Sequence, residues 1–342
     1  MTRFPPAFSL FPSFLLVLVL SGCSTEPETA DIEHFHNPSW SPDGMLVAAG
    51  YERFASTDPR NGAPPGSPNF YILDLSARRE PHAFHVEGFS HLDRFWILPD
   101  SPRVIAAITK DGLLFFDRDG KRKGLLTKPT LPVKPTCACF SNTGSSFLWA
   151  GNDNGRLKIG TASYTSEPWH PSSVMLLKDT SAETGVTDVL RTSDTTYAVR
   201  FDDGTVSEYR LDGTERARFS LVPLRDATPW LLRLHKFSDV SGHVSLYAVD
   251  DSGIVMLNPG SQTMTFLVKG VIRGFDINPL TSFMVFETRT GDTWLALRDG
   301  QPLLRLAPQH IMPSLSPDGK SYAAVACLTP YRDTLTVKSF SR

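Results

Sequence analysis

The chain has 342 residues, of which 41% are apolar and 20% charged, and its formal net charge is −2. This balance excludes an electrostatic basis for nucleic-acid binding, because phosphate recognition needs an excess of lysine and arginine. The 27 prolines and 24 glycines are spread along the whole chain. Turn-forming residues between many short apolar runs favour an all-β protein.

The N-terminus has the features of an export signal. Arg3 supplies a positive charge, and an apolar stretch over 14–20 follows it, too short for a stable membrane anchor. The next residues, Leu20-Ser21-Gly22-Cys23, resemble the lipobox of bacterial lipoproteins. The resemblance implies cleavage before Cys23 and attachment of acyl chains, palmitate among them, to this cysteine. The alternative is an ordinary secretory peptide in which Cys23 is incidental.

We therefore expect three segments: a signal peptide over 1–22, a lipidated tether over 23–31 and a folded domain over 32–342. The tether is polar and acidic, as suits a short flexible linker. Several acyl chains would hold the protein firmly at a membrane. By the sorting habit of bacterial lipoproteins, Ser24 favours the outer membrane on its periplasmic side. The inner membrane remains the alternative.

The cysteines and histidines of the domain give no cofactor signature. Cys137 and Cys139 share one face of a probable strand and are poorly placed to pair with each other. Either one can meet Cys327, but buried free thiols are the simpler interpretation. No spacing resembles a zinc site, and the His34/His36 pair lacks a third ligand. We therefore expect no metal and no cofactor.

A repeated unit runs through the domain. Similar apolar strands end near residues 74, 117, 161, 210, 258, 298 and 339. The ends are 40 to 49 residues apart, which gives seven units of about 44 residues. Tight turns rich in Asp, Asn and Gly precede most of these strands, and further apolar strands precede the turns. Four antiparallel strands in a unit of this length are typical of a propeller blade. No long segment has a helical apolar period, so we expect almost no helix.

One tetrapeptide occurs at both ends of the domain. Ser41-Pro42-Asp43-Gly44 and Ser316-Pro317-Asp318-Gly319 resemble the core of the WD40-like PD40 repeat of TolB-type β-propellers. In that family the tetrapeptide forms the turn between the first two strands of a blade, where Pro presets φ and Gly accepts the unusual geometry. The resemblance implies an all-β, seven-bladed propeller of four-stranded antiparallel blades. Only the first and last units carry the full motif.

The ring must close between the two ends of the chain. The last unit has room for three strands, whereas residues 32–36 precede the first unit without a partner. We predict that 32–36 supplies the missing outer strand of the last blade, which would hide an open sheet edge. The alternative is a tail beside a three-stranded last blade.

We interpret the protein as a rigid scaffold lipoprotein of the cell envelope and not as an enzyme. No Gly-x-Ser-x-Gly nucleophile motif is present. A long Pro/Gly-rich loop over 54–69 is expected to border one mouth of the central channel, with Asp58, Arg60 and Asn61 as candidate contacts. TolB-type proteins bind envelope partners, which agrees in kind. We expect a monomer with an unidentified protein partner.

An enzyme of the lactonase or lyase type, working in the central channel, is the alternative. Three acids fall near inner strands: Asp188, Asp239 and Asp276. Three histidines lie near strand ends: His235, His243 and His310. Solvated loop acids and scattered histidines are the simpler interpretation. A cluster of three or more such groups at one channel mouth would favour the enzyme, and an apolar patch on the loop face would favour a binding protein.

Overall fold

The structure is a computed structural model of the chain. It describes residues 31–340 except for 56–63, 65, 77–80, 91–92, 99–103, 142–144, 182–183, 226–227, 229, 240, 279, 307–308 and 330–331. The described residues form strands and turns without any helix, so they contain no helix of a length and apolarity that would cross a membrane.

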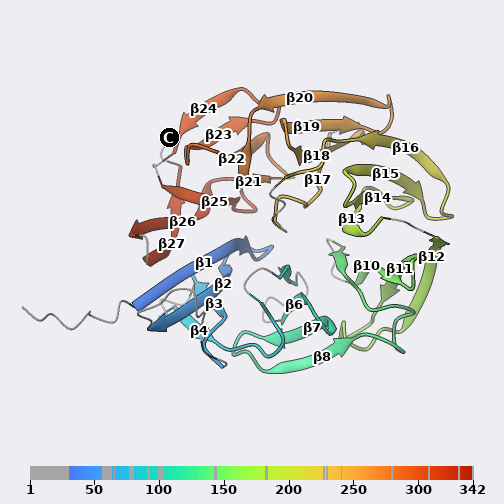
Figure 1. The fold of residues 1–342 in the computed structure, drawn as a ribbon, viewed down its shortest axis with the longest axis horizontal. Helices are drawn as coiled ribbons and strands as arrows, with labels where there is room; N and C mark the ends of the chain where they lie inside the picture. Colours follow the sequence, from blue (N-terminus) through green and yellow to red (C-terminus); the bar gives the residue numbers. More distant parts are fainter. Residues whose placement is uncertain are drawn as a thin grey trace, which may run out of the picture.

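Five four-stranded antiparallel sheets stand around a common centre, like the blades of a propeller (Figure 1). The first contains β5 (Phe95–Ile97), β6 (Val104–Thr109), β7 (Gly112–Asp117) and β8 (Arg122–Leu126). The second contains β9 (Cys137–Phe140), β10 (Ser146–Asp153), β11 (Arg156–Ser163) and β12 (Ser173–Ser181). The third contains β13 (Val186–Arg191), β14 (Thr196–Phe201), β15 (Thr205–Arg210) and β16 (Glu215–Ser220). The fourth contains β17 (His235–Ser238), β18 (Val244–Asp250), β19 (Gly253–Asn258) and β20 (Thr263–Lys269). The fifth contains β21 (Ile272–Ile277), β22 (Phe283–Thr288), β23 (Thr293–Leu297) and β24 (Pro302–Arg305).

The remaining strands form one seven-stranded sheet that joins the two ends of the chain. Its order is β25-β26-β27-β1-β2-β3-β4. The strands are β1 (Asp31–Trp40), β2 (Leu46–Ala55), β3 (Phe70–Asp74), β4 (His82–Phe84), β25 (His310–Leu315), β26 (Ser321–Thr329) and β27 (Arg332–Ser339). The predicted all-β propeller of four-stranded antiparallel blades is thus confirmed, with five blades as separate sheets instead of the predicted seven.

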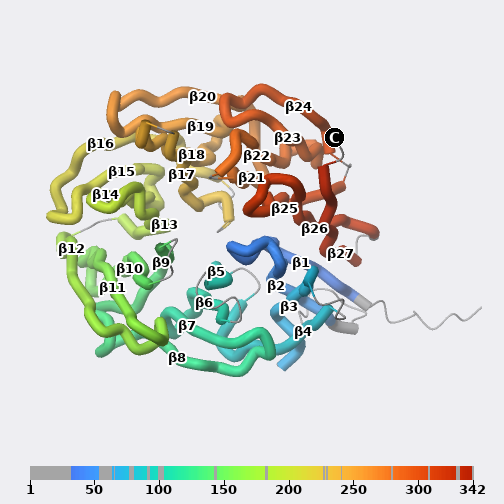
Figure 2. Tube along the Cα trace, turned by 180° about the vertical axis from the view of Figure 1, so that it is seen from behind, coloured from blue at the N-terminus to red at the C-terminus, as the bar shows by residue number. Residues whose placement is uncertain are grey.

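The predicted closing strand over 32–36 is not confirmed as a separate element. These residues belong to β1, which pairs antiparallel with β2 from Asp31 to Trp40. β1 meets β27 through a single parallel pair, Glu33 with Arg332. Figure 2 shows the two strands side by side where the ends of the ring meet. Their contact is made mainly by side chains: Arg332 Nε lies 3.0 Å from Glu33 Oε2, and His34 Nδ1 lies 3.0 Å from Asp333 Oδ2.

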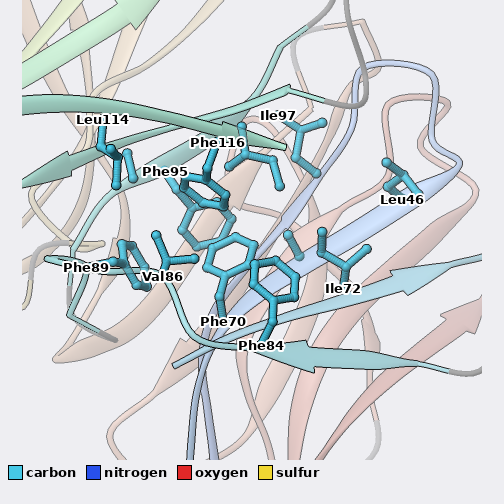
Figure 3. Close-up of a cluster of buried hydrophobic side chains, with 13 residues drawn as sticks. Leu46, Phe70, Ile72, Phe84, Val86, Phe89, Phe95, Ile97, Leu114 and Phe116 are labelled. Carbon is cyan, nitrogen blue, oxygen red and sulfur yellow. The ribbon is translucent and has the colours of Figure 1, made fainter. Parts of the chain in front are cut away.

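Apolar side chains fill the spaces between neighbouring sheets. Figure 3 shows the cluster between β2–β4 and β5–β7. Phe70 lies at its centre, fully buried, with edge-to-face contacts to Phe89, Phe95 and Phe116 at centroid distances of 4.9 to 5.3 Å. Such pairs add about 0.5–1.5 kcal/mol each to the energy of burial. The cluster fixes adjacent sheets at a constant angle and so holds the inner strands in place.

The three cysteines of the described chain are free thiols, as the sequence indicated. Cys137 is buried, and Cys139 and Cys327 are half-buried. Burial raises the pKa of each thiol above its usual value. These thiols are therefore protonated at neutral pH.

Candidate active site in the central channel

The two copies of the repeated motif form equivalent turns after β1 and β25. The Gly44 N–H donates to the Ser41 carbonyl and the Gly319 N–H to the Ser316 carbonyl, each at 2.9 Å. Both glycines have positive φ, 72° and 66°. In each turn the serine Oγ also accepts an N–H from the start of the next strand. The predicted turns between first and second strands are therefore confirmed.

Just before each turn, the preceding strand contains a bulge that the sequence did not reveal. The pairing of β1 shifts between His36 and Ser39, and that of β25 between Ile311 and Ser314. Inside the bulges, Asn37 (φ 53°) and Met312 (φ 50°) adopt left-handed conformations that are uncommon for such residues. Both residues line the same cavity, so the repeated motif builds two adjoining walls of the channel.

Hydrogen bonds join the two walls, β1 from the start of the chain and β25 from its end. The Asn37 N–H points to Met312 Sδ at 3.4 Å, and Trp40 Nε1–H donates to the Ser314 carbonyl at 3.0 Å. Trp230 is fixed in a similar way, because its Nε1–H donates to the Arg273 carbonyl at 3.1 Å. The two indole rings therefore stand in fixed orientations at the cavity.

The cavity has a volume of about 750 Å³, within the usual range for small-molecule sites. Residues from β1, β5, β9, β13, β17, β21 and β25 line it, so it occupies the centre of the ring. Five aromatic side chains contribute to the lining: Trp40, Trp96, Phe140, Trp230 and Phe275. Flat apolar rings around a few polar groups are typical of a site that binds a small organic molecule.

A histidine and an aspartate form the polar centre of the cavity. His235 Nδ1 lies 3.4 Å from Asp276 Oδ1, and the imidazole packs edge-on against Phe275. The other oxygen of Asp276 accepts the Ser314 hydroxyl and the Leu315 N–H, both at 2.9 Å. The carboxylate is therefore held firmly beside the imidazole.

This environment leaves His235 ready to act as a base. Burial lowers its pKa, the nearby Arg233 charge lowers it further, and Asp276 opposes the shift only in part. The imidazole is therefore neutral at pH 7. When Nδ1–H points to Asp276, the lone pair lies on Nε2, which is buried without a hydrogen-bond partner. A neutral imidazole with an unpartnered Nε2 is suited to accept a proton once the ring turns this atom toward the cavity.

The order of the groups does not match a serine nucleophile. In a catalytic triad the histidine lies between the serine and the acid. Here Asp276 lies between Ser314 and His235, so the Ser314 hydroxyl donates to the carboxylate and not to the imidazole. This arrangement favours proton abstraction from a bound molecule over acyl transfer to the protein.

Cationic side chains flank this pair. Arg233 and Lys236 line the cavity, and Lys236 Nζ donates to a neutral carbonyl, that of Arg191, at 2.6 Å. By contrast, Arg94 is paired with Asp188 at 2.7 Å, and the second oxygen of Asp188 accepts the Leu234 N–H at 2.6 Å. The cavity is thus positively charged on the side of Arg233 and Lys236.

The structure separates the acids and histidines that were candidates for a channel site. Asp276 lines the channel and Asp188 is buried in an ion pair with Arg94, against the simpler interpretation that they are solvated loop acids. Asp239 instead caps a turn by accepting the N–H groups of Ser241 and His243. Among the histidines, His235 lines the cavity, His243 is exposed, and His310 is buried against Tyr322.

Other predicted sites lie outside the described residues. Cys23, the proposed lipid attachment point, and the loop contacts Asp58, Arg60 and Asn61 belong to segments that the structure does not describe. Conversely, no predicted site included Arg233 or Lys236. Their signal was present in Arg233-Leu-His-Lys236, where three ionisable side chains enter a strand whose counterparts in other units are mostly apolar.

Comparisons with known proteins show the fold. No family model matches the chain, and no curated protein has a significantly similar sequence. An oligogalacturonate lyase, solved in complex with manganese, is similar with a TM-score of 0.60, 12% identity and 91% coverage of both chains. Raptor from Chaetomium thermophilum is similar with a TM-score of 0.60 and 13% identity over 92% of this chain and 29% of Raptor. At these identities the likeness establishes a β-propeller, and TolB-type membership remains a resemblance.

The expectation that the protein is not an enzyme needs correction. A propeller that matches nine-tenths of this chain is a lyase. The absence of a nucleophile motif did not justify the expectation, because proton abstraction needs no such motif. Proton abstraction needs a base and a nearby charge, and residues from separate strands can supply both.

The manganese of that neighbouring structure prompts a test of the channel for metal ligands. Among the described residues, no group of three or more His, Cys, Asp and Glu side chains is placed to hold a metal ion. His235 and Asp276 form a pair without a third ligand, and the cationic Arg233 is close enough to lower the pKa of His235. The donor set present in the channel does not fit a divalent cation.

Proposed function

We propose that the protein is a propeller enzyme of the lyase type, which removes a proton beside the carboxylate of a substrate bound in the central channel. One observation carries this proposal: His235 lines the cavity, its Nε2 is buried without a hydrogen-bond partner, and its Nδ1 lies 3.4 Å from the fixed carboxylate of Asp276. Because Nε2 is covered, the ring must turn toward the cavity when a substrate binds. The lactonase alternative finds less support, because Ser314 is not placed as a nucleophile.

The proposed reaction follows from these groups. His235 Nε2 accepts the proton from the carbon next to the substrate carboxylate, and the electron pair of that C–H bond forms a carbon–carbon double bond. The group on the next carbon leaves with its bonding electrons. Asp276 stabilises the imidazolium that forms, and a positive side chain stabilises the charge that develops on the carboxylate.

The aromatic walls indicate the kind of substrate. Fixed indoles such as Trp40 and Trp230 offer flat surfaces on which a ring can stack. The neighbouring solved enzyme is a lyase of oligogalacturonate, a saccharide in which each ring has a carboxylate. We therefore choose acidic saccharides as the first substrates to test.

Turnover of trigalacturonate by the purified full chain tests the proposal. Elimination forms an unsaturated product that is followed by its ultraviolet absorbance. We expect activity in the wild-type protein and a loss of 100-fold or more in His235→Asn, as is typical when a general base is removed. His243→Asn is the matched control, because His243 is exposed in a turn outside the cavity. Absence of elimination, or equal activity of both variants, would reject the proposal.

Three further features remain proposals. We propose that the seven-stranded sheet consists of two blades, with β1 closing a ring of seven through its contacts with β27. We also retain lipid attachment at Cys23, and with it an outer-membrane location; the lipobox resemblance supports this, and metabolic labelling with palmitate tests it. Envelope proteins that bind the loop face remain the proposed partners, and cross-linking in membranes tests them.

A further inference from the structure

We propose that the side chain of Arg233, and not a divalent metal ion, binds the substrate carboxylate in the central channel. The proposal rests on the proposed function for its choice of substrate. It extends that function by assigning the group that recognises the acid. It also accounts for the difference between this channel and the manganese complex of the neighbouring structure.

The guanidinium group of Arg233 has unused hydrogen-bond donors. Nε and Nη2 of Arg233 are buried and have no hydrogen-bond partner. These two atoms form one edge of the guanidinium, whose parallel N–H donors match the two oxygens of a carboxylate. A buried donor without a partner destabilises the folded protein. A carboxylate on this edge would satisfy both donors at once.

The backbone around Arg233 is held rigidly. The next residue, Leu234, donates its N–H to Asp188 at 2.6 Å, and Asp188 is locked to Arg94 at 2.7 Å. Both members of this ion pair are buried, at 7% and 6% side-chain exposure. Each oxygen of Asp188 already accepts one donor, from Arg94 or from Leu234. The pair therefore fixes the backbone beside Arg233, and Asp188 adds a favourable electrostatic interaction with its guanidinium.

The charge around the site favours an anion over a cation. Of the charged side chains lining the cavity, Asp276 faces His235 and accepts three other donors, from Ile277, Ser314 and Leu315. Arg233 and Lys236 add two positive charges to the same cavity. A metal ion here would be repelled by these cations, whereas an anion would be attracted. Because Nε and Nη2 of Arg233 are covered, the side chain must rotate toward the cavity when the anion binds.

Calorimetric titration of the full chain in EDTA, with trigalacturonate as the probe, tests the inference. We expect binding without metal, weakened by about 10- to 100-fold in Arg233→Met, the loss expected for charge-assisted hydrogen bonds. Arg225→Met is the matched control, because Arg225 is an exposed arginine paired with Asp251 on the surface. The methyl ester of trigalacturonate should bind wild type as weakly as the acid binds Arg233→Met.

The comparison of the acid with its methyl ester uses only the wild-type protein, so this part of the test does not depend on how the variants fold. The inference is overturned if the acid and its ester bind alike, if neither binds, or if the acid binds only after manganese is added. It is also overturned if manganese alone binds tightly and His235→Asn abolishes that binding. Binding through Arg233 without turnover would instead contradict the proposed lyase activity and leave the inference intact.

Discussion

At the scale of single residues, the channel contains ionisable groups whose environment sets their protonation. Burial lowers the pKa of His235 below its ordinary value of 6.5. The base is therefore already free at neutral pH. We expect kcat/KM of the proposed reaction to stay constant from pH 7 to 8. It should fall on the acid side with a midpoint below 6.5, where His235 gains its proton. A midpoint above 7 would show that another group is the base.

Glu287 gives a second prediction, for stability. Its carboxyl is buried behind the channel wall and accepts the Met312 N–H at 3.0 Å. Burial raises its pKa from 4.5 to about 7, against the opposing effects of that hydrogen bond and of Arg273. Between pH 4.5 and pH 7 the folded protein therefore binds a proton that the unfolded chain has released. The stability that this proton confers is lost as pH rises toward 7.

The neutral isostere Glu287→Gln removes this loss. We expect it to raise the free energy of unfolding at pH 8 by roughly 3 kcal/mol and to change little at pH 4.5. Denaturant unfolding at both pH values measures the difference. Destabilisation at pH 8 would mean that the ionised carboxylate is the favoured form in the folded protein.

At the scale of elements, the sequence predicted strands well and bulges poorly. The predicted strand ends near 74, 117 and 210 coincide with the ends of β3, β7 and β15. Apolar alternation and Asp-Gly turns are local signals, so they can be read without the fold. The bulges at Asn37 and Met312 depend on contacts across the gap between the chain ends, which no local pattern reports.

The two motif glycines offer a matched test of the turns. Both have positive φ, so alanine at either position costs about 1 kcal/mol. A Cβ at Gly44 would meet its nearest neighbour, Pro317, at 3.7 Å, whereas one at Gly319 would lie 2.6 Å from Thr281 Cγ2. We expect Gly319→Ala to be the more destabilising by about 1 kcal/mol or more. Equal losses in thermal unfolding would show that the clash is relieved without cost.

At the scale of the whole molecule, the ring is held where β1 meets β27. Asp333 is 8% exposed and accepts His34 Nδ1 at 3.0 Å, whereas Arg332 is an exposed side chain paired with Glu33. We expect Asp333→Ala to cost about 1–3 kcal/mol of unfolding free energy and Arg332→Ala less than 1 kcal/mol. If both changes are neutral, side-chain contacts between β1 and β27 do not hold the ring.

The assembly of the site is also a property of the whole molecule, and the sequence alone could not predict it. The repeat length predicted the propeller, because each blade is a local unit. The site instead combines His235 from β17, Asp276 from β21 and Ser314 from β25. These residues become neighbours only when the blades surround the channel. Their roles therefore required the structure, although Asp276 had been named as a channel acid.

The most direct measurement of the central claim is proton exchange at the substrate carbon. NMR of trigalacturonate in D2O with the wild-type chain should show loss of the signal of the proton beside the carboxylate, by exchange or by elimination. His235→Asn should leave that signal unchanged over the same time, while His243→Asn behaves as wild type. A signal that persists with the wild-type protein, or decays equally with His235→Asn, would contradict the role of His235 as the base of the channel.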